Sequence, residues 1–297
     1  MNLLPRSGAV DGSQPEGVVV VDKPAGWTSH DLVARVRRIA DTKRVGHAGT
    51  LDPMATGVLV VGIGRATRLL GYLAGHDKDY LATIRLGMTT STDDVEGEPL
   101  ASYDAGGVAA DAVREAMQGL TGDIEQVPPA VSAIKVRGQR AYRRARSGEE
   151  VVLAARPVTV ARFELLTHHG TDLDVAVSCS SGTYIRALAR DLGAALGVGA
   201  HLTALRRTRV GAFGVDQAAS LDQLAQSWGP VPLAQVVATN FPRVDVSADD
   251  AIRIGHGQKL PLALPDVGPV GVFAPDDSVI ALVANRDGVA KPLCVFV

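Results

Sequence analysis

The chain has 297 residues, which exceeds the common size of one domain and predicts a large domain followed by a small one. Its two cysteines, Cys179 and Cys294, lie 115 positions apart, so the sequence indicates neither a disulfide framework nor a zinc site. This suits the reducing cytosol, and a cytoplasmic location is expected. No apolar run is long enough to span a membrane. Residues 1–16 lack the apolar core of a signal peptide and are expected to form a disordered leader.

In chain order, apolar spacing predicts a strand at residues 17–22 and then a helix, with Ser29 as its expected N-cap. The next predicted elements are a strand at 58–63, a short helix at 65–73, an alternating strand at 80–86 and a loop at 89–99. They are followed by a helix at 108–120, paired strands at 158–166 and 173–179, and an amphipathic helix at 183–196. Because strands and helices do not alternate regularly, we expect an α+β fold with a mixed, largely antiparallel sheet flanked by helices.

The pattern loosens at residues 227–232 and again at Pro242. We therefore expect a main domain at 17–240 and a small β-rich domain at 243–297. In the small domain the pattern predicts a helix near 248–254 and strands at 270–273, 279–283 and 293–297. A cap that only stabilises the main domain is an alternative role for this segment.

Residues 46–60 hold a carboxylate, Asp52, and an imidazole, His47, in a glycine-rich loop that leads into an apolar strand. Pro53 keeps Asp52 out of the helical region, and glycines permit sharp turns or close backbone approach. Such a loop can offer a carboxylate to a substrate. The alternative is that Asp52 only caps a turn, as is common for Asp-Pro pairs.

The net charge of −2 alone argues against strong nucleic-acid binding, but the cations are clustered. One cluster holds six cations and no acid in twelve positions: Lys135, Arg137, Arg140, Arg143, Arg144 and Arg146. Two further clusters lie at 35–44 and 206–209. Cations that contact phosphates release counterions and strengthen binding at low salt. One cluster alone would be typical of a solvated helix face, whereas three beside a candidate active site favour RNA.

Five ordered motifs over roughly residues 18–210 resemble those of the TruB-type tRNA pseudouridine synthase family. They are 20–29 (VVDKPAGWTS), 46–60 around Asp52, 79–87 (DYLATIRLG), 126–135 (QVPPAVSAIK) and 179–186 (CSSGTYIR). The resemblance implies the pseudouridine synthase fold, and residues 243–297 resemble the family's PUA-like C-terminal domain. It also implies isomerisation of uridine 55 in the T-arm loop of tRNA, without cofactor or metal, by a monomer that does not bind membranes.

The resemblance further assigns roles to single residues. Asp52 would be the catalytic acid, acting on the sugar or base as a nucleophile or removing a ribose proton, and Arg186 would keep it ionised. A buried carboxylate needs such a cation to offset desolvation, and the guanidinium fork suits a carboxylate. Tyr80 would stack on the target uracil.

Four other positions would contact the substrate or support its loop. Tyr184 and Leu205 would form the walls of the base pocket, and His47 would fill the space that the flipped base leaves in the RNA. Lys23 would brace the loop that carries Asp52 and meet a phosphate. Residues 126–153 would form an insertion that closes over the RNA. Val131 departs from the family pattern, where an aromatic residue is expected.

Other classes fit less well. The Gly62-Ile63-Gly64 sequence lacks the third glycine of a dinucleotide fingerprint, since position 67 is Thr67, and no Walker motif is present. A glycoside hydrolase needs a second carboxylate, for which the sequence offers no nearby candidate. The remaining alternative is a T-arm-binding RNA-folding module in which catalysis is secondary or absent.

Overall fold

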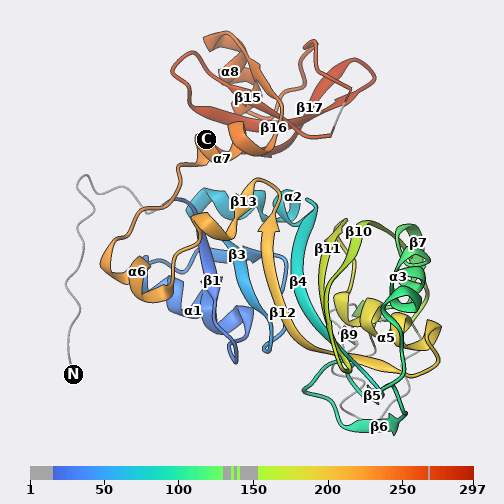
Figure 1. Ribbon diagram of the computed structural model, residues 1–297. Coiled ribbons are helices and arrows are strands. Elements are labelled where there is room, and N and C mark those ends of the chain that lie inside the picture. The colour runs from blue at the N-terminus through green and yellow to red at the C-terminus, as the bar shows by residue number, and fades with distance from the viewer. Residues whose placement is uncertain (1–15, 130–134, 137–138, 141–152, 267) are drawn as a thin grey trace. The chain divides into compact units, whose positions relative to one another are not determined.

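The computed structural model describes residues 16–129, 135–136, 139–140, 153–266 and 268–297 (Figure 1). The expected leader therefore lies, up to residue 15, outside the described residues. The α+β fold class is confirmed, because antiparallel strand pairs and helices make up the described chain. The chain divides into two compact units. Unit 1 holds residues 1–53, 57–74 and 210–297, and unit 2 holds residues 54–56 and 75–209.

Unit 1 begins with β1 (Gly17–Lys23), which pairs with β3 (Thr56–Ile63); β3 also pairs with β2 (Val45–Ala48), and both pairs are antiparallel. The helix α1 (Ser29–Ile39) packs its apolar face against these strands, as its apolar spacing predicts. A 3₁₀ helix η1 (Gly64–Leu69) and α2 (Leu70–Ala74) follow β3. The N-cap of α1 is Thr28 rather than the predicted Ser29, because the Thr28 hydroxyl accepts from the Asp31 N–H and Asp31 accepts from the Thr28 N–H.

The C-terminal part of unit 1 contains a second, four-stranded sheet in the order β14-β15-β16-β17. Its first pair is parallel and the others are antiparallel. The elements from residue 213 onward are β13 (Phe213–Gly214), η2 (Val215–Gln217), α6 (Leu221–Gln226), α7 (Leu233–Asn240), β14 (Arg243–Asp245), α8 (Ala248–Gly255), β15 (Val270–Phe273), β16 (Val279–Arg286) and β17 (Val289–Val295). The helix and the three strands predicted from the sequence correspond to α8, β15, β16 and β17.

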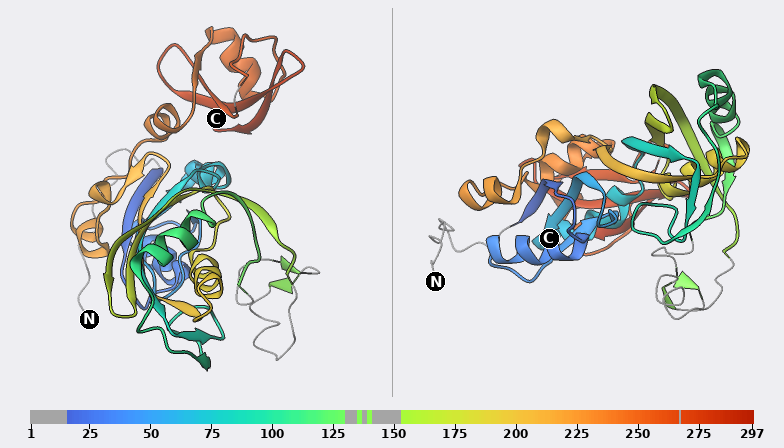
Figure 2. Two further views of the ribbon diagram at one scale, coloured as in Figure 1. Left: turned by 45° about the vertical axis from the view of Figure 1, so that its right-hand side comes forward. Right: turned by 60° about the horizontal axis from the view of Figure 1, so that its bottom comes forward.

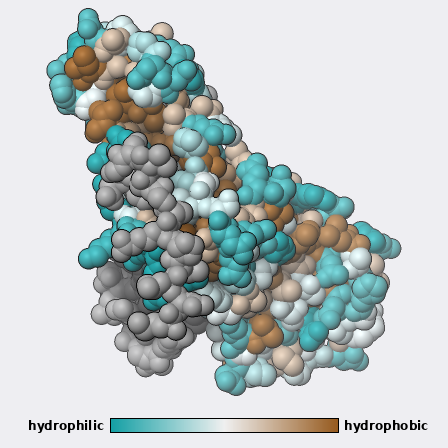
Figure 3. Space-filling view, turned by 90° about the vertical axis from the view of Figure 1, so that its left-hand side faces the viewer, coloured by the Kyte–Doolittle hydropathy of each residue, from teal (hydrophilic) through white to brown (hydrophobic). Residues whose placement is uncertain are grey.

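Two apolar clusters stabilise this sheet. One is local and joins α8 with the strands, including Ile254, Val270 and Ala281. The other also reaches α7 and the first strands of the chain, since Val18, Val237 and Phe296 belong to the same cluster. The sheet therefore has a core of its own and also completes the core of unit 1. On the face seen in Figure 3, hydrophilic side chains separate the apolar patches.

Unit 2 is built on antiparallel pairs in the order β4-β11-β10-β7. Helices α3 and α5 lie side by side along it (Figure 2). Its elements are β4 (Lys78–Leu86), β5 (Met88–Thr90), β6 (Pro99–Ser102), α3 (Ala110–Gln118), β7 (Gly122–Gln126), β8 (Lys135–Val136), β9 (Gln139–Arg140), β10 (Arg156–His169), β11 (Asp172–Cys179), α5 (Ile185–Ala195) and β12 (Ala200–Val210). The predicted pairing of residues 158–166 with 173–179 is confirmed by the register of β10 and β11.

The loop predicted at residues 89–99 is only partly right, because β5 and β6 form a short hairpin at its two ends. The Asp and Gly content of this segment conceals the strands from composition alone. None of the helices in the described ranges is long and apolar enough to cross a membrane.

Candidate active site

In unit 1, Asp52 lies half-buried in the loop between β2 and β3, directly before Pro53. The glycines around it have the predicted backbone roles. Gly49 and Gly57 adopt positive φ angles of 88° and 96°. A Cβ at Gly46 would lie 2.8 Å from the Leu70 side chain. The loop is therefore shaped by positions at which a side chain would not fit.

The Lys23 side chain braces this loop. Lys23 is fully buried at the end of β1, and its ammonium group donates to the carbonyl oxygens of Pro24 at 2.9 Å, Trp27 at 2.6 Å and Pro53 at 3.1 Å. An ammonium has three N–H donors, so these carbonyls take up all of them. The geometry supports a bracing role next to Asp52, and the phosphate contact expected of Lys23 stays a prediction.

A second tie runs from the start of α1 to the same loop. The buried Ser29 hydroxyl accepts from the Leu51 N–H at 2.9 Å and donates to the Leu51 carbonyl at 3.1 Å. The Gly26 N–H donates to the Pro53 carbonyl at 2.9 Å. Main-chain groups on both sides of Asp52 are thus held by the segment between β1 and α1.

His47 lies on β2 opposite Val61, and its ring meets the ring of His30 edge to face, with centroids 5.7 Å apart. An imidazole from β2 and one from α1 therefore lie in contact. In the chain, β2 directly precedes the loop that carries Asp52. His30 was not among the residues singled out from the sequence.

In unit 2, Tyr80 lies on β4 opposite Val177 of β11 and is 7 % exposed. The preceding residue, Asp79, accepts two hydrogen bonds from the Arg209 guanidinium, at 2.6 and 2.9 Å. This bidentate contact holds the pKa of Asp79 below its usual value. The strand that carries Tyr80 is therefore fixed at its N-terminal end.

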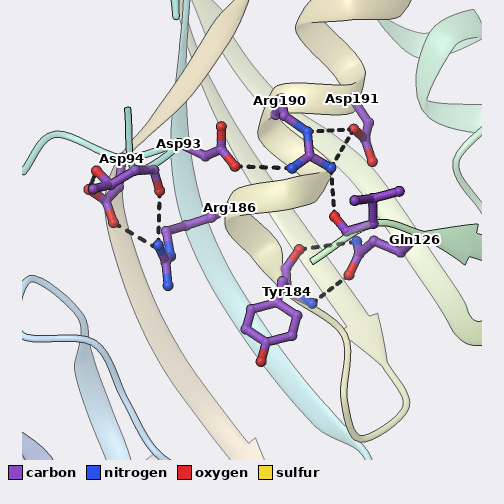
Figure 4. A network of polar contacts seen from close by, with 9 residues as sticks. Asp93, Asp94, Gln126, Tyr184, Arg186, Arg190 and Asp191 are labelled. Carbon is purple, nitrogen blue, oxygen red and sulfur yellow. Dashed lines mark hydrogen bonds and ion pairs between the residues drawn. The ribbon is translucent and has the colours of Figure 1, made fainter. Parts of the chain in front are cut away.

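Arg186 is buried in the first turn of α5. Its guanidinium donates to the Thr92 carbonyl at 2.9 Å and lies 3.5 Å from the Asp94 carboxylate, which is also buried (Figure 4). The loop between β5 and β6 thus supplies both named partners of this arginine. A guanidinium has five N–H donors, so it can hold these partners and a further carboxylate.

Tyr184 and Leu205 take different places in unit 2. Tyr184 is the N-cap of α5 and is half-buried. Leu205 is buried on β12 and lines a hollow of about 460 Å³ together with Leu81, Thr83 and Arg206.

The predicted RNA-backbone residues lie mostly outside the described part of the chain. Arg137, Arg143, Arg144 and Arg146 are not described, nor is Val131. Lys135 and Arg140 face each other in the β8–β9 hairpin, of which only the backbone is described.

The other two cation clusters differ. In the 35–44 cluster, Arg38, Lys43 and Arg44 are exposed, as phosphate binding requires. In the 206–209 cluster, Arg207 is 1 % exposed and Arg209 pairs with Asp79, so the prediction that this cluster binds RNA is wrong for Arg207 and unsupported for Arg209. Alternation along β12 places Arg207 on the same face as the buried Leu205.

Sequence reasoning missed a set of polar partners in unit 2. They are Asp93, Asp94, Gln126 and Arg190, which join the β5–β6 loop, β7 and α5 (Figure 4). Gln126 opens the Gln-Val-Pro-Pro motif, which was the one available signal. Among the described residues, no three His, Cys, Asp or Glu side chains converge as metal ligands would.

Family models match three consecutive parts of the chain. Residues 37–185 match "TruB family pseudouridylate synthase (N terminal domain)", residues 186–231 match "tRNA pseudouridylate synthase B C-terminal domain", and residues 241–297 match "tRNA Pseudouridine synthase II, C terminal". The tRNA pseudouridine synthase B of Thermobifida fusca is 60% identical over 95% of this chain and 98% of its own. That of Mycobacterium ulcerans is 56% identical over 99% and 98%.

Two solved structures contain chains that are similar to this one in sequence and fold. A Cbf5-Nop10-Gar1 complex contains a chain that is 28% identical, with a TM-score of 0.74 over 95% of this chain and 85% of that one. An H/ACA RNP bound to a substrate RNA containing 2'-deoxyuridine contains a chain that is 27% identical, with a TM-score of 0.72 over the same shares.

Proposed function

Because the chain belongs to the TruB family of tRNA pseudouridine synthases, we propose that its substrate is the T-arm stem-loop of tRNA, in which it isomerises uridine 55. The chain is an enzyme of the isomerase class that acts on tRNA. The target position, the catalytic residues and the chemical route are parts of the proposal.

In the proposed reaction, the C1′–N1 bond breaks, the uracil turns, and C5 bonds to C1′. The proton on C5 is lost and N1 gains a proton, so no oxidant, reductant or other co-reactant is needed. Asp52 acts on the sugar or base as a nucleophile, or removes a ribose proton, and each role requires it to be ionised in a site that excludes water. Arg186 supplies the compensating positive charge, and Tyr80 stacks on the uracil.

The observation that carries this proposal is the bracing of the Asp52 loop. Two buried side chains, Lys23 and Ser29, hold the main chain on both sides of this carboxylate. A turn-capping aspartate would not need a buried ammonium beside it, whereas a reacting group must be held within a fraction of an ångström.

The RNA must give up a stacked base, which costs a few kcal/mol and is offset by stacking and edge hydrogen bonds in the pocket. We propose that Tyr184 and Leu205 provide pocket walls and that His47 enters the vacated space. The cations of the 126–153 insertion and of the 35–44 cluster hold the backbone. The enzyme is proposed to work in the cytoplasm as a monomer, without cofactor, metal or membrane, through a main domain at 17–240 and a PUA-like domain at 243–297.

Replacing Asp52 by Asn tests the proposal, because Asn keeps the shape but cannot ionise or attack. On a T-arm stem-loop labelled with tritium at uracil C5, Asp52→Asn should release tritium at least about 1,000-fold more slowly than the wild type. Its affinity for the RNA should stay within about threefold. Asp287→Asn is the matched control, since Asp287 is exposed in a turn with φ 55°, which Asn tolerates.

Undiminished tritium release by Asp52→Asn would exclude the catalytic role of Asp52. A wild-type chain that binds the stem-loop but releases no tritium would favour the RNA-folding module instead.

A further inference from the structure

Gln126 uses its buried amide to hold the main chain of Tyr184. It is the last residue of β7 and is 1 % exposed. Its Oε1 accepts from the Tyr184 N–H at 2.8 Å, and its Nε2 donates to the Tyr184 carbonyl at 3.2 Å (Figure 4). The two bonds form a closed pair between residues 58 positions apart. One side chain thus pairs with Tyr184 as a neighbouring strand would.

The Tyr184 main chain needs such a partner because of its place in the chain. It is the N-cap of α5, with extended φ and ψ angles of −105° and 114° and no side-chain cap. Its carbonyl already accepts the first helical hydrogen bond, from Leu188 at 3.1 Å. The N–H of Tyr184 itself precedes the helix and has no acceptor within it. The Gln126 amide therefore fixes the peptide at which the extended chain turns into the helix.

A second contact ties the same end of β7 to α5 nearly two turns further along. Arg190 donates to the Val127 carbonyl at 2.7 Å and to the Asp93 carboxylate at 3.1 Å. It also pairs with Asp191 at 2.9 Å. Burial raises the pKa of Asp93, and the Arg190 charge opposes that rise. Residues 126 and 127 are thus held at two points of one helix.

We propose that Gln126 is a positioning residue, which sets the direction of the Tyr184 ring and of Arg186 two residues later. This inference rests on the proposed function, in which Tyr184 lines the base pocket and Arg186 serves Asp52. In this role Gln126 acts on neither the substrate nor a reacting atom directly. It acts through the main chain, where a displacement of about 1 Å can slow a reaction about 100-fold.

Gln126→Met keeps the length of the side chain and removes both hydrogen bonds. Under single-turnover conditions with saturating T-arm stem-loop, the rate should fall between about 10-fold and 100-fold. The Kd for the RNA should stay within about threefold. Gln126→Glu keeps the acceptor for the Tyr184 N–H and loses the donor, so its rate should lie between those of the wild type and Gln126→Met.

Gln223→Met is the control, because Gln223 also holds a main-chain N–H, that of Ser220 at 2.8 Å, but in α6 of unit 1. Its rate should equal that of the wild type. Hydrogen exchange of the Tyr184 amide supplies a readout independent of activity. Gln126→Met should accelerate it, whereas Gln126→Glu, which keeps the acceptor for this N–H, and Gln223→Met should not.

A folded Gln126→Met or Gln126→Glu protein with the wild-type rate would overturn the inference, and so would a loss confined to RNA affinity. Unchanged exchange at the Tyr184 amide in Gln126→Met would also overturn it. A wild-type chain that forms no pseudouridine would refute the proposed function, whereas the exchange result would still report whether Gln126 holds Tyr184.

Discussion

Lys78 and Cys179 lie opposite each other on β4 and β11, and both side chains are buried. Burial disfavours the charged form of each group. It therefore lowers the pKa of Lys78 to about 8, with a further contribution from the Arg207 charge, and raises the pKa of Cys179 to about 11. The opposing effects of Cys179 and Asp77 on the pKa of Lys78 are smaller. This pair makes the stability of unit 2 depend on pH above neutrality.

We expect the free energy of unfolding to rise between pH 8 and 9. Between the folded pKa of Lys78, about 8, and its ordinary value of 10.5, the unfolded chain binds more protons than the folded one. Stability then increases with pH, by at most about 1.4 kcal/mol per pH unit. The contribution of Cys179 to stability has the opposite sign up to about pH 11, because its folded pKa lies above its ordinary value of 9.0. Cys294, whose pKa burial also raises, adds to this opposing effect, so the rise due to Lys78 is steepest nearer pH 8.

Urea unfolding at a series of pH values measures this effect. The rise should be present in the wild type and lost in Lys78→Met, whereas Cys179→Ala should extend it toward pH 10.5. Lys259→Met, at an exposed position, should keep the wild-type slope. Equal slopes in the wild type and Lys78→Met would contradict the assignment.

At the scale of elements, α5 depends on a glycine for its contact with the start of β12. A Cβ at Gly193 would lie 2.2 Å from the Ala200 nitrogen and 2.4 Å from the Gly199 carbonyl carbon. Both atoms belong to the backbone, so they cannot turn aside as a side chain would. At Gly71, in α2, a Cβ would meet nothing within 4 Å.

We expect the same substitution to have opposite effects at these two positions. Gly193→Ala should lower the free energy of unfolding by about 3 kcal/mol through overpacking. Gly71→Ala should raise it by up to about 1 kcal/mol, because alanine restricts the unfolded chain and favours the helix. The denaturant midpoints of the two variants, compared with that of the wild type, measure these changes in stability. A neutral or stabilising Gly193→Ala would mean that α5 does not pack closely on residues 199–200.

Elements with clean apolar periodicity were predictable from the sequence, and polar ones were not. The β10–β11 pair and α5 have alternating or helical spacing and appear close to their predicted bounds. β12 was missed because Arg206, Arg207 and Arg209 conceal its alternation, although Arg207 is buried. Composition cannot show that a cation on a strand points into the protein.

The candidate site was predictable only as a set of separate motifs. The motifs indicate Asp52, Tyr80 and Arg186, but they do not indicate the side chains that hold these three residues in place. Asp94 lies 92 positions before Arg186 and has no motif of its own, so only the folded chain brings the two together. Lys23 was expected to brace the Asp52 loop, but its three carbonyl partners could not be deduced from spacing.

At the scale of the whole molecule, the C-terminal sheet shares a core with the start of the chain. Leu233, Val236 and Val237 of α7 are buried in the same cluster as Val18 and Phe296. A Cβ at Gly271 of β15 would lie 2.5 Å from the Val237 side chain, which shows how closely strand and helix approach.

Removing residues 241–297 should therefore destabilise the rest of unit 1. Each apolar side chain that becomes exposed costs about 1.5 to 3 kcal/mol. A chain ending at residue 240 should melt about 10 °C lower than the full chain, or aggregate. Removing only the exposed Val297 should have little effect. Equal melting temperatures for the full chain and the 240-residue chain would show that the C-terminal sheet is an independent attachment.

The division of the chain between the two units also bears on the order in which it folds during synthesis. The bulk of unit 2, residues 75–209, is continuous and is synthesised before residues 210–297. Val18 and Val20, although made first, belong to a cluster that closes only when Phe296 has been added. The first strands of the chain must then wait for its last residues, with a growing polypeptide of more than 200 residues between them. If translation stalls within residues 210–297, the nascent chain contains all of unit 2 but only part of unit 1, whose apolar cluster is then exposed.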